Sequence, residues 1–391
     1  MKNRIKALAR ELAPAFIDIR HHIHSHPELS FEEYATSAFI RQKLDEFGVS
    51  YRADVAGTGI IALIEGKNSS KRTIAIRADI DALPIHEANN VPYKSKNEGV
   101  MHACGHDVHT TCVLGATKIL QQLKDEFEGT IKVLFQPGEE KHPGGASLMI
   151  RDGALENPRP DAILGMHVQP SMETGKLGFR AGKYMASADE IYITIKGKGG
   201  HAAQPHLTTD TILVASHLVV SLQQIISRNN DPFSPSVLSI CAFNGGYTTN
   251  VIPSEVKLMG TFRAMDETWR FKAHELIKKH ATELAHAMGA AIDIDILVGY
   301  PTLYNNETVT AGARSLAENY LGTEYVEDTE VRMGAEDFAY YSQVIPACFF
   351  RLGTGNKARG ITSGVHTPTF DIDENAIEIG MGAMAYLAAS L

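Results

Sequence analysis

The residues most able to do chemistry lie in one short stretch, residues 102–109, which reads HACGHDVH. This stretch holds one thiol and three imidazoles beside a carboxylate, and Cys104 and His106 stand two positions apart. Thiolate sulfur and neutral imidazole nitrogen are both good ligands for zinc-like divalent ions. A redox cysteine or a hydrogen-bonded histidine cluster at the start of a helix would give the same letters, so this stretch alone leaves both interpretations open.

Two further groups of possible ligands each follow an apolar run. Glu139 and Glu140 come after the run TIKVLF at 130–135, and His167 stands near the end of the run at 161–168. Neighbouring side chains of an extended segment point to opposite sides, so one glutamate can bind a metal while the other carries a proton. Taken alone, the glutamate pair would indicate only a solvated loop. The candidate metal ligands are Cys104, His106, one of these two glutamates, His167 and His366, the last in the sequence GVHTP.

Such ligands suit a pair of close divalent ions. Two such ions lower the pKa of a bound water molecule and polarise a carbonyl group. A free carboxylate must remain to move the proton. Because mixed thiolate and imidazole ligation suits several metals, the sequence predicts two divalent ions per subunit and leaves manganese, zinc, nickel and cobalt open.

The candidate residues fall where the strands of a parallel sheet would end. Before residue 186 the apolar patterns alternate between strands and helices, which indicates an α/β domain with a mostly parallel sheet and helices on both faces. In such sheets, ligands bind at the carboxyl ends of the strands. The side chains at predicted strand ends are Asp79, Asp81, Glu139, Glu140 and His167. We therefore expect them to share one site.

Residues 186–298 follow a different pattern. Their predicted order of strand, helix, strand, strand, helix and strand is that of a ferredoxin-like sandwich. After residue 298 the first pattern resumes, so we predict a first domain made of residues 1–185 and 299–391. The ferredoxin-like domain of residues 186–298 would then be an insertion within it.

The inserted segment carries its own polar candidates. His201 lies in the glycine-rich sequence KGKGGHAA, where small neighbours would let it approach a ligand closely. Asn250 and Arg263 lie beside predicted strands, and a guanidinium group can bind a carboxylate through two hydrogen bonds. An ordinary glycine turn at His201 and a surface ion pair at Arg263 are the structural alternatives.

The segment before the second predicted helix contains a local start signal. Ser30 and Glu33 have the spacing of a capping box, in which the two side chains bind the first N–H groups of a helix. We therefore expect these residues to open a helix that runs to Phe47 and stops at Gly48.

The composition excludes several classes of protein. The chain has 391 residues, of which 44% are hydrophobic and 21% charged, as in a globular protein of about two domains. A net charge of −9 argues against nucleic acid or an anionic membrane as the main partner. The four cysteines are too few and too scattered for a disulfide framework, and the N-terminal 23 residues read as an amphipathic helix rather than a signal peptide. We expect a soluble, cytoplasmic protein.

Ten motifs, in order along nearly the whole chain, resemble those of a family of dinuclear metallohydrolases. That family includes aminoacylases, hippurate hydrolase, bacterial N-acetyl-diaminopimelate deacetylase and plant auxin-conjugate (IAA-amino acid) hydrolases. The motifs are HPELSFEE at 26–33, RADIDALP at 77–84, HACGHDVH at 102–109, FQPGEE at 135–140, GMHV at 165–168, KGGHAAQPH at 198–206, NVIP at 250–253, GTFRAMD at 260–266, MGAEDFAYY at 333–341 and HTPTF at 366–370.

The resemblance implies roles for the candidate residues. The implied metal ligands are Cys104, His106, Glu140, His167 and His366. Glu139 resembles the general base, and His201 resembles a histidine of the inserted lid domain that stabilises the oxyanion in the partner subunit's site. Asn250 and Arg263 resemble residues that hold the substrate's carbonyl or carboxylate group. The family also implies a homodimer formed through the lid domain.

The chain departs from the wider family at one strand end. Many members carry H-x-D where this chain reads Asp79-Ile80-Asp81, so a histidine ligand is missing. This departure is similar to the subgroup that acts on N-acyl amino acids, and it makes Asp81 an orienting residue rather than a ligand. We therefore predict a metal-dependent amidohydrolase that releases a carboxylate and a free amino acid. A dipeptidase or carboxypeptidase on the same scaffold and a non-catalytic metal-binding relative are the alternatives.

Overall fold

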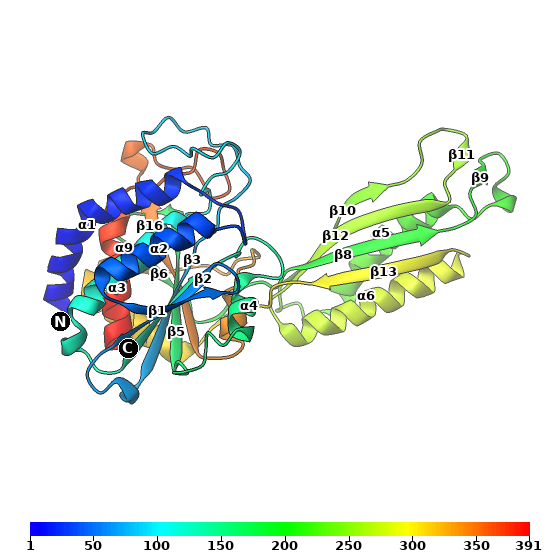
Figure 1. The fold of residues 1–391 in the computed structure, drawn as a ribbon. Helices are drawn as coiled ribbons and strands as arrows, with labels where there is room; N and C mark the ends of the chain where they lie inside the picture. The colour runs from blue at the N-terminus through cyan, green and yellow to red at the C-terminus, as the bar shows by residue number, and fades with distance from the viewer. The chain divides into compact units, whose positions relative to one another are not determined.

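The computed structural model describes residues 1–391, which form two compact units (Figure 1). The first unit consists of Met1–Gly182, Tyr304–Glu330 and Asp337–Leu391, and the second of Lys183–Leu303 and Val331–Glu336. The short segment 331–336 joins the second unit because Arg332 exchanges backbone hydrogen bonds with Tyr184 and Ala186. The predicted domain boundaries did not include this segment in the inserted domain.

The first unit is built on an eight-stranded sheet with the order β1-β2-β4-β3-β5-β16-β6-β15. Its central strands β4, β3, β5 and β16 are parallel, whereas β1 and β2 add an antiparallel edge. The strands are β1 (Ser50–Val55), β2 (Gly59–Glu65), β3 (Thr73–Asp79), β4 (Thr130–Gln136), β5 (Ala162–Glu173), β6 (Leu177–Phe179), β15 (Val326–Asp328) and β16 (Ala347–Gly355). The buried central strands are mostly apolar, as parallel strands covered on both faces tend to be, but β3, β4 and β16 each carry one buried cation, Arg77, Lys132 and Arg351. The predicted mostly parallel α/β fold is confirmed.

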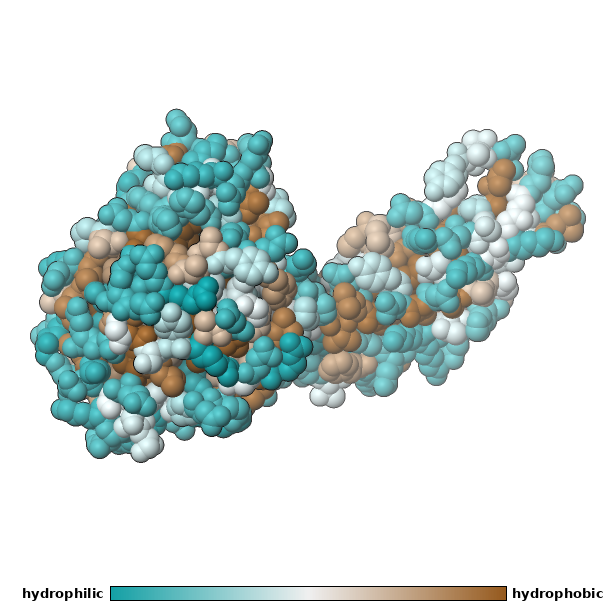
Figure 2. Space-filling view, in the orientation of Figure 1, coloured by the Kyte–Doolittle hydropathy of each residue, from teal (hydrophilic) through white to brown (hydrophobic).

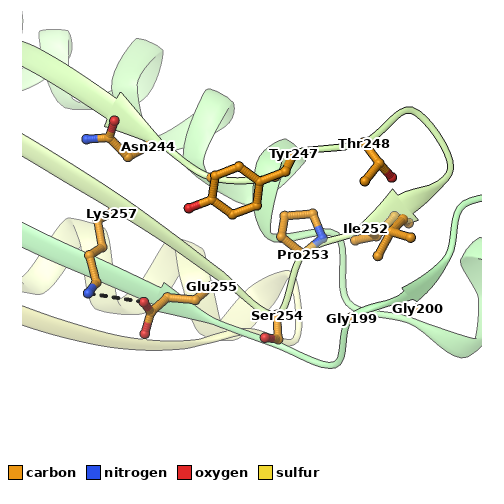
Figure 3. A pocket seen from close by; sticks show the side chains of 13 residues that line it. Gly199, Gly200, Asn244, Tyr247, Thr248, Ile252, Pro253, Ser254, Glu255 and Lys257 are labelled. Atoms are coloured by element: carbon orange, nitrogen blue, oxygen red, sulfur yellow. Dashed lines mark ion pairs between the residues drawn. The ribbon is translucent and has the colours of Figure 1, made fainter.

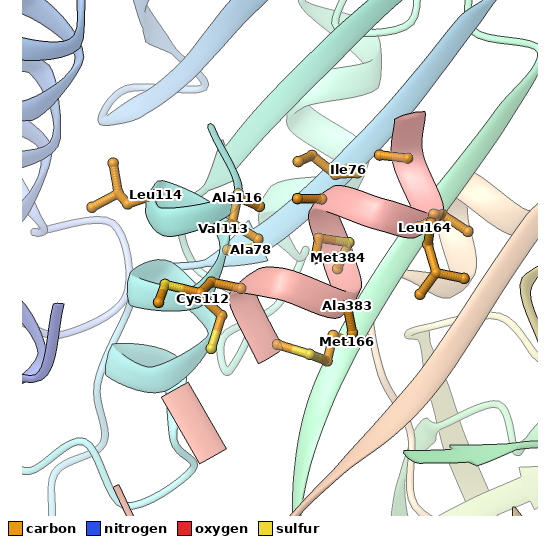
Figure 4. Close-up of a cluster of buried hydrophobic side chains, with 14 of the residues drawn as sticks. Ile76, Ala78, Cys112, Val113, Leu114, Ala116, Leu164, Met166, Ala383 and Met384 are labelled. Carbon is orange, nitrogen blue, oxygen red and sulfur yellow. The ribbon is translucent and has the colours of Figure 1, made fainter. Parts of the chain in front are cut away.

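Helices cover both faces of this sheet. They are α1 (Lys2–Ser25), α2 (Tyr34–Phe47), α3 (His106–Gln122), α4 (Gly145–Arg151), α7 (Glu307–Leu321), α8 (Ala339–Ser342) and α9 (Asn375–Ser390). Along β3, Ile74 and Ile76 point into the main core, where α3 and α9 pack together (Figure 4). Arg77 points to the opposite face and binds Asp337, just before α8, through Nη2 and Oδ1 at 2.7 Å. Because side chains alternate along a strand, the second face is free to carry the polar groups of a site.

The second unit has the βαββαβ order that its sequence predicted. An antiparallel sheet with the order β10-β12-β8-β13 packs against α5 and α6. These elements are β8 (Asp189–Lys196), α5 (Thr211–Asn229), β10 (Ser236–Asn244), β12 (Glu255–Ala264), α6 (Glu267–Ala287) and β13 (Ala291–Val298). Two short pairs complete the strands: β9 (Gly200–His201) with β11 (Val251–Ile252), and β7 (Gly182–Met185) with β14 (Leu303–Asn305).

The predicted capping box at Ser30 and Glu33 is wrong. Helix α2 begins at Tyr34, and no side chain at its N-cap position, Glu33, binds the helix. Instead, the carboxylate of Glu28 accepts the N–H groups of Ala35 at 3.0 Å and Thr36 at 2.8 Å. The side chains of Ser30 and Glu33 are bound to distant residues, so tertiary partners have replaced the local ones.

The visible surface of both units mixes hydrophilic and hydrophobic residues, with hydrophilic residues in the majority (Figure 2). None of the helices combines the length and the apolar character needed to span a membrane.

Candidate metal centre and active site

The structure brings the five candidate ligands together at the carboxyl ends of the central strands. The Sγ atom of Cys104, in the loop before α3, lies 3.4 Å from Nε2 of His167 and 3.3 Å from Nε2 of His366. Oε1 of Glu140 lies 3.0 Å from Nε2 of His366 and 4.0 Å from Nε2 of His106. We call these five residues the ligand cluster.

The free atoms of the ligand cluster fit metal ions. His106 donates from Nδ1 to the Asp81 carbonyl at 2.9 Å, while its buried Nε2 has no hydrogen-bond partner. His167 donates from Nδ1 to the Val168 carbonyl at 2.8 Å, which leaves its Nε2 facing Cys104. A buried polar atom without a partner costs about 1–3 kcal/mol, and a cation at this place would remove that cost.

The ligand atoms also form two overlapping sets. In each set, the three ligand atoms lie within 4.8 Å of one another. The first set is Cys104, His106 and His167, and the second is Cys104, Glu140 and His366. The shared thiol suits two cations held close together, with sulfur, nitrogen and oxygen donors of the kinds that zinc-like ions accept.

The pKa values of the ligand cluster differ between its members. Burial raises the pKa of the Cys104 thiol, and the charge of Glu140 raises it further. Hydrogen bonds to Cys104 and Glu140 raise the pKa of His366 to about 10. Burial and the neighbouring His109 lower the pKa of His167 well below its usual value. Metal binding requires a deprotonated thiol and neutral imidazoles, so cations would displace protons from Cys104 and His366, whereas the lowered pKa of His167 already favours its neutral form.

Asp81 connects two members of the ligand cluster. Its Oδ1 lies 3.1 Å from Nδ1 of His106, and its Oδ2 accepts the Glu140 N–H at 3.0 Å. The Ser30 hydroxyl donates to the same Oδ2 at 2.6 Å. Burial acts to raise the pKa of Asp81, but the hydrogen bonds from His106 and Ser30 outweigh it and keep the pKa below its usual value. This geometry supports the predicted orienting role, since Asp81 fixes the ring of His106 and the start of Glu140.

A second buried carboxylate, Asp79, organises residues that the sequence analysis did not single out. His109 donates from Nδ1 to Asp79 Oδ1 at 2.6 Å and accepts the Val168 N–H on Nε2 at 2.9 Å. Both ring nitrogens of His109 are therefore used, and it ties β3 to β5 instead of joining the ligand cluster. Arg77 donates to Asp79 Oδ2 at 2.6 Å. The spacing of His106 and His109 on one helix face was the signal that could have revealed this link.

Glu139 lies beside the ligand cluster with its carboxylate buried. Its Oε2 is 4.0 Å from Nε2 of His106, and its Oε1 accepts the Asp337 N–H at 3.4 Å. The side chain is 8% exposed, so it is held within the site. A carboxylate at this distance can exchange a proton with a group bound at the cluster.

The remaining three predicted site residues belong to the second unit. His201 is exposed on β9, and its Nδ1 accepts the Ala203 N–H at 3.1 Å. Asn250 precedes β11, and its Oδ1 accepts the Thr248 hydroxyl at 2.9 Å. Arg263 is on β12, where its Nε donates to the Thr261 hydroxyl at 3.3 Å and burial lowers its pKa. No carboxylate forms a salt bridge with Arg263, so the predicted alternative of a surface ion pair does not hold.

A groove of about 660 Å³ lies in the second unit next to the β9–β11 pair (Figure 3). Its lining includes Gly199, Tyr247 and Pro253, together with Lys257 and Glu255, which form an ion pair at 3.3 Å. His201 and Asn250 stand on the same two strands or beside them but do not line this groove.

The fold and the site together define a metal-dependent hydrolase. Residues 75–390 match Peptidase family M20/M25/M40. The chain belongs to this family and is a hydrolase that acts on amide bonds, so the resemblance seen in its motifs is confirmed.

Relatives and solved structures agree with this assignment. N-acetyl-L-cysteine deacetylase of Bacillus subtilis is 40% identical over 366 residues, which cover 94% of this chain and 85% of that protein. Thermostable carboxypeptidase 2 of Saccharolobus solfataricus is 36% identical over 388 residues, covering 98% and 97%. The crystal structure of the Bacillus subtilis YXEP protein, a dinuclear metal-binding peptidase of the M20 family, has a TM-score of 0.83 at 34% identity, covering 97% of this chain and 98% of that chain.

Proposed function

We propose that this protein hydrolyses the amide bond of N-acyl amino acids, such as N-acetyl or benzoyl derivatives, to a carboxylate and a free amino acid. The observation that carries the proposal is the convergence of five ligand side chains with a further buried carboxylate, that of Glu139, whose Oε2 lies 4.0 Å from Nε2 of His106. The similarity to N-acetyl-L-cysteine deacetylase supports the acyl class of the substrate.

We further propose that the ligand cluster holds two divalent ions per subunit, of manganese, zinc, nickel or cobalt. When bound, these ions would lower the pKa of a water molecule and polarise the substrate carbonyl. The name of the YXEP protein as a dinuclear metal-binding peptidase supports the number of ions. Asp81 would keep His106 in the orientation that presents Nε2 to the cluster.

In this proposal Glu139 is the general base. Its carboxylate takes a proton from the attacking water and later gives that proton to the leaving amine nitrogen. The burial of Glu139 favours the role, because a shielded carboxylate is not solvated by bulk water when it accepts the proton.

The second unit would complete the site through three residues. We propose that His201 stabilises the oxyanion in the site of a partner subunit, that Asn250 holds the substrate carbonyl and that Arg263 binds the free carboxylate of the amino acid. The exposure of His201 and the lack of a salt bridge at Arg263 support these roles. A forked guanidinium without a carboxylate partner is available for a bidentate contact with substrate.

We propose a homodimer that forms through the second unit. Most of the large apolar side chains that are exposed belong to this unit, including Val220 at 74% and Phe233 at 96% exposure. Apolar patches are visible on its surface in Figure 2. Large exposed apolar patches often mark sites of protein–protein interaction.

The four free cysteines support a reducing, cytoplasmic location. The net charge of −9 argues against nucleic acid and membrane surfaces as partners.

The runner-up is a carboxypeptidase or dipeptidase, which the similarity to thermostable carboxypeptidase 2 favours. A panel of substrates separates the two. The protein is loaded with manganese, zinc, nickel or cobalt in turn and offered N-acetyl and N-benzoyl amino acids beside dipeptides, with EDTA as the control. We expect faster hydrolysis of the acyl amino acids and none with EDTA. Faster hydrolysis of dipeptides would establish the runner-up, and tight metal binding without hydrolysis would show a non-catalytic relative.

A further inference from the structure

The side chain of Glu33 binds the turn that carries the proposed base. Glu33 is fully buried, and its Oε1 accepts two backbone N–H groups, from Phe31 and from Gly138, each at 2.8 Å. Its Oε2 accepts the Thr58 hydroxyl at 2.6 Å. Gly138 immediately precedes Glu139, so one oxygen of Glu33 is linked directly to the turn.

Each of the three successive peptide groups around Glu139 is held by a hydrogen bond. The first is held by the bond from the Gly138 N–H to Glu33. The second is held because the Gly138 carbonyl accepts the Gly145 N–H at 3.0 Å. The third is held because the Glu140 N–H donates to Asp81 at 3.0 Å. Peptide groups are planar, so fixing these planes fixes the backbone of the turn and the direction of the Glu139 side chain.

The first of these planes depends most on its hydrogen bond. Gly138 has φ +57°, in the left-handed region that glycine enters and leaves at little cost. Phe31 covers it so closely that a Cβ on Gly138 would lie 2.4 Å from the Phe31 ring. Phe31 is itself left-handed, with φ 68°, and such strained residues gather at functional sites. A single oxygen of Glu33 binds the N–H groups of both left-handed residues, Phe31 and Gly138, and so fixes their relative position.

We propose that Glu33 is a positioning residue of the reaction: its carboxylate holds the turn at residues 138–140 so that Glu139 faces the ligand cluster. The inference rests on the proposed function, in which Glu139 is the base. This role would also explain the HPELSFEE segment at 26–33, whose Ser30 and Glu33 do not cap helix α2. Ser30 acts from the same segment on the other side of the turn, through Asp81.

Two substitutions of Glu33 separate position from charge. Glu33→Gln loses the charge but keeps an oxygen at the same reach, and its amide can donate to the Thr58 hydroxyl. Glu33→Asp keeps the charge but is one methylene too short to hold both N–H groups. We expect kcat of Glu33→Asp to fall about 10-fold to 100-fold, as small misplacements of catalytic groups do, and kcat of Glu33→Gln to fall less than about 5-fold. KM and the metal content of both purified holoenzymes should match those of the wild type.

Thr58→Val is the matched control, because it removes a hydrogen bond from Oε2 of the same carboxylate and leaves the turn's bond to Oε1 in place. Its kcat should stay within about 2-fold of the wild type. A Glu33→Asp protein with normal kcat would overturn the inference. So would a loss of kcat that follows a loss of metal, or one that Thr58→Val shares. Wild type and variants are assayed on both acyl amino acids and dipeptides, so a wild-type preference for dipeptides contradicts only the proposed substrate.

Discussion

The ligand cluster of the first unit and a buried network in the second unit are built from similar side chains. In the second unit, Asp189 accepts two bonds from Arg270, one from His274 at 2.8 Å and one from the Gly299 N–H at 3.0 Å. Both of its oxygens are fully used. In the first unit, by contrast, Nε2 of His106 is buried without a hydrogen-bond partner, close to a carboxylate and a thiol.

This contrast distinguishes a structural network from a site. A complete network stabilises the elements that it joins, here β8, α6 and the end of β13, and offers nothing to a ligand. An incomplete network contains a buried polar atom that has lost its hydrogen bond to water without gaining another, which destabilises the fold. Such atoms are rare in folded proteins. We therefore expect a ligand at the incomplete network, in the first unit. Substitutions in either unit can test this difference between the two networks.

The largest effect should come from Cys104→Ala. Cys104 belongs to both sets of ligand atoms, so its loss should weaken both metal positions. We expect kcat/KM to fall at least about 1,000-fold, with a lower metal content in the purified protein. Circular dichroism should show an unchanged fold. An active Cys104→Ala protein with its full metal content would remove the thiol from the site.

The next effect concerns stability. Asp189→Asn removes the buried carboxylate charge opposite Arg270, which then keeps only Glu267 as an ion-pair partner. Breaking a buried ion pair costs about 3–5 kcal/mol in other proteins. We expect urea unfolding of the second unit to show a loss of this order, while the metal content of the first unit is unchanged. An equal loss of metal would show that the two networks do not have separate roles.

Two arginines of the second unit sharpen the comparison further. Arg270 is fully paired, whereas Arg263 has no salt bridge. Arg263→Lys should raise KM for N-acetyl amino acids about 10-fold with little change in stability, since lysine cannot make the bidentate contact. Arg270→Lys should do the reverse and lower stability without raising KM. If both variants raise KM to the same extent, Arg263 does not bind substrate in the way we propose.

The smallest effect is a pH dependence. Burial acts to raise the pKa of Asp189, but the hydrogen bonds from Arg270 and His274 outweigh it and hold the pKa below its usual value. A depressed carboxyl pKa adds stability above the unfolded value of about 3.9, and that stability is lost as the pH falls toward the folded value. The stability difference between wild type and Asp189→Asn should therefore be constant from about pH 7 to pH 5 and shrink below about pH 4. Urea unfolding at several pH values measures it, and a difference that grows on acidification would reverse the assigned sign.

The sequence predicted the parts of the site that depend on a periodic pattern. The rule that parallel sheets bind ligands at strand ends placed Asp81, Glu140 and His167 near one another, and the structure shows the hydrogen bond from Glu140 to Asp81. His366 was a candidate ligand by its residue type alone, and no periodic pattern could place it beside the others. His366 stands in a loop, with φ 60°, more than 200 residues beyond Cys104 in the sequence.

The sequence could not predict the hydrogen-bond partners of buried polar side chains. Ser30 and Glu33 have the spacing of a capping box, yet their partners are Asp81 and Gly138, far along the chain. Local spacing describes only the bonds available within one turn, whereas burial against a distant loop decides which bonds form. The Asp189 network was missed for the same reason, because its members lie 81 and 85 residues apart.

Metal content measured beside turnover tests the central claim most directly. Wild type, Glu139→Gln and Glu140→Gln are stripped with EDTA, reloaded with manganese or zinc, desalted and analysed for bound metal and for hydrolysis of an N-acetyl amino acid. We predict two ions and no turnover for Glu139→Gln, and fewer ions and no turnover for Glu140→Gln. A Glu139→Gln protein that still hydrolyses its substrate, or that loses metal as Glu140→Gln does, would contradict the division of labour between the two neighbouring glutamates.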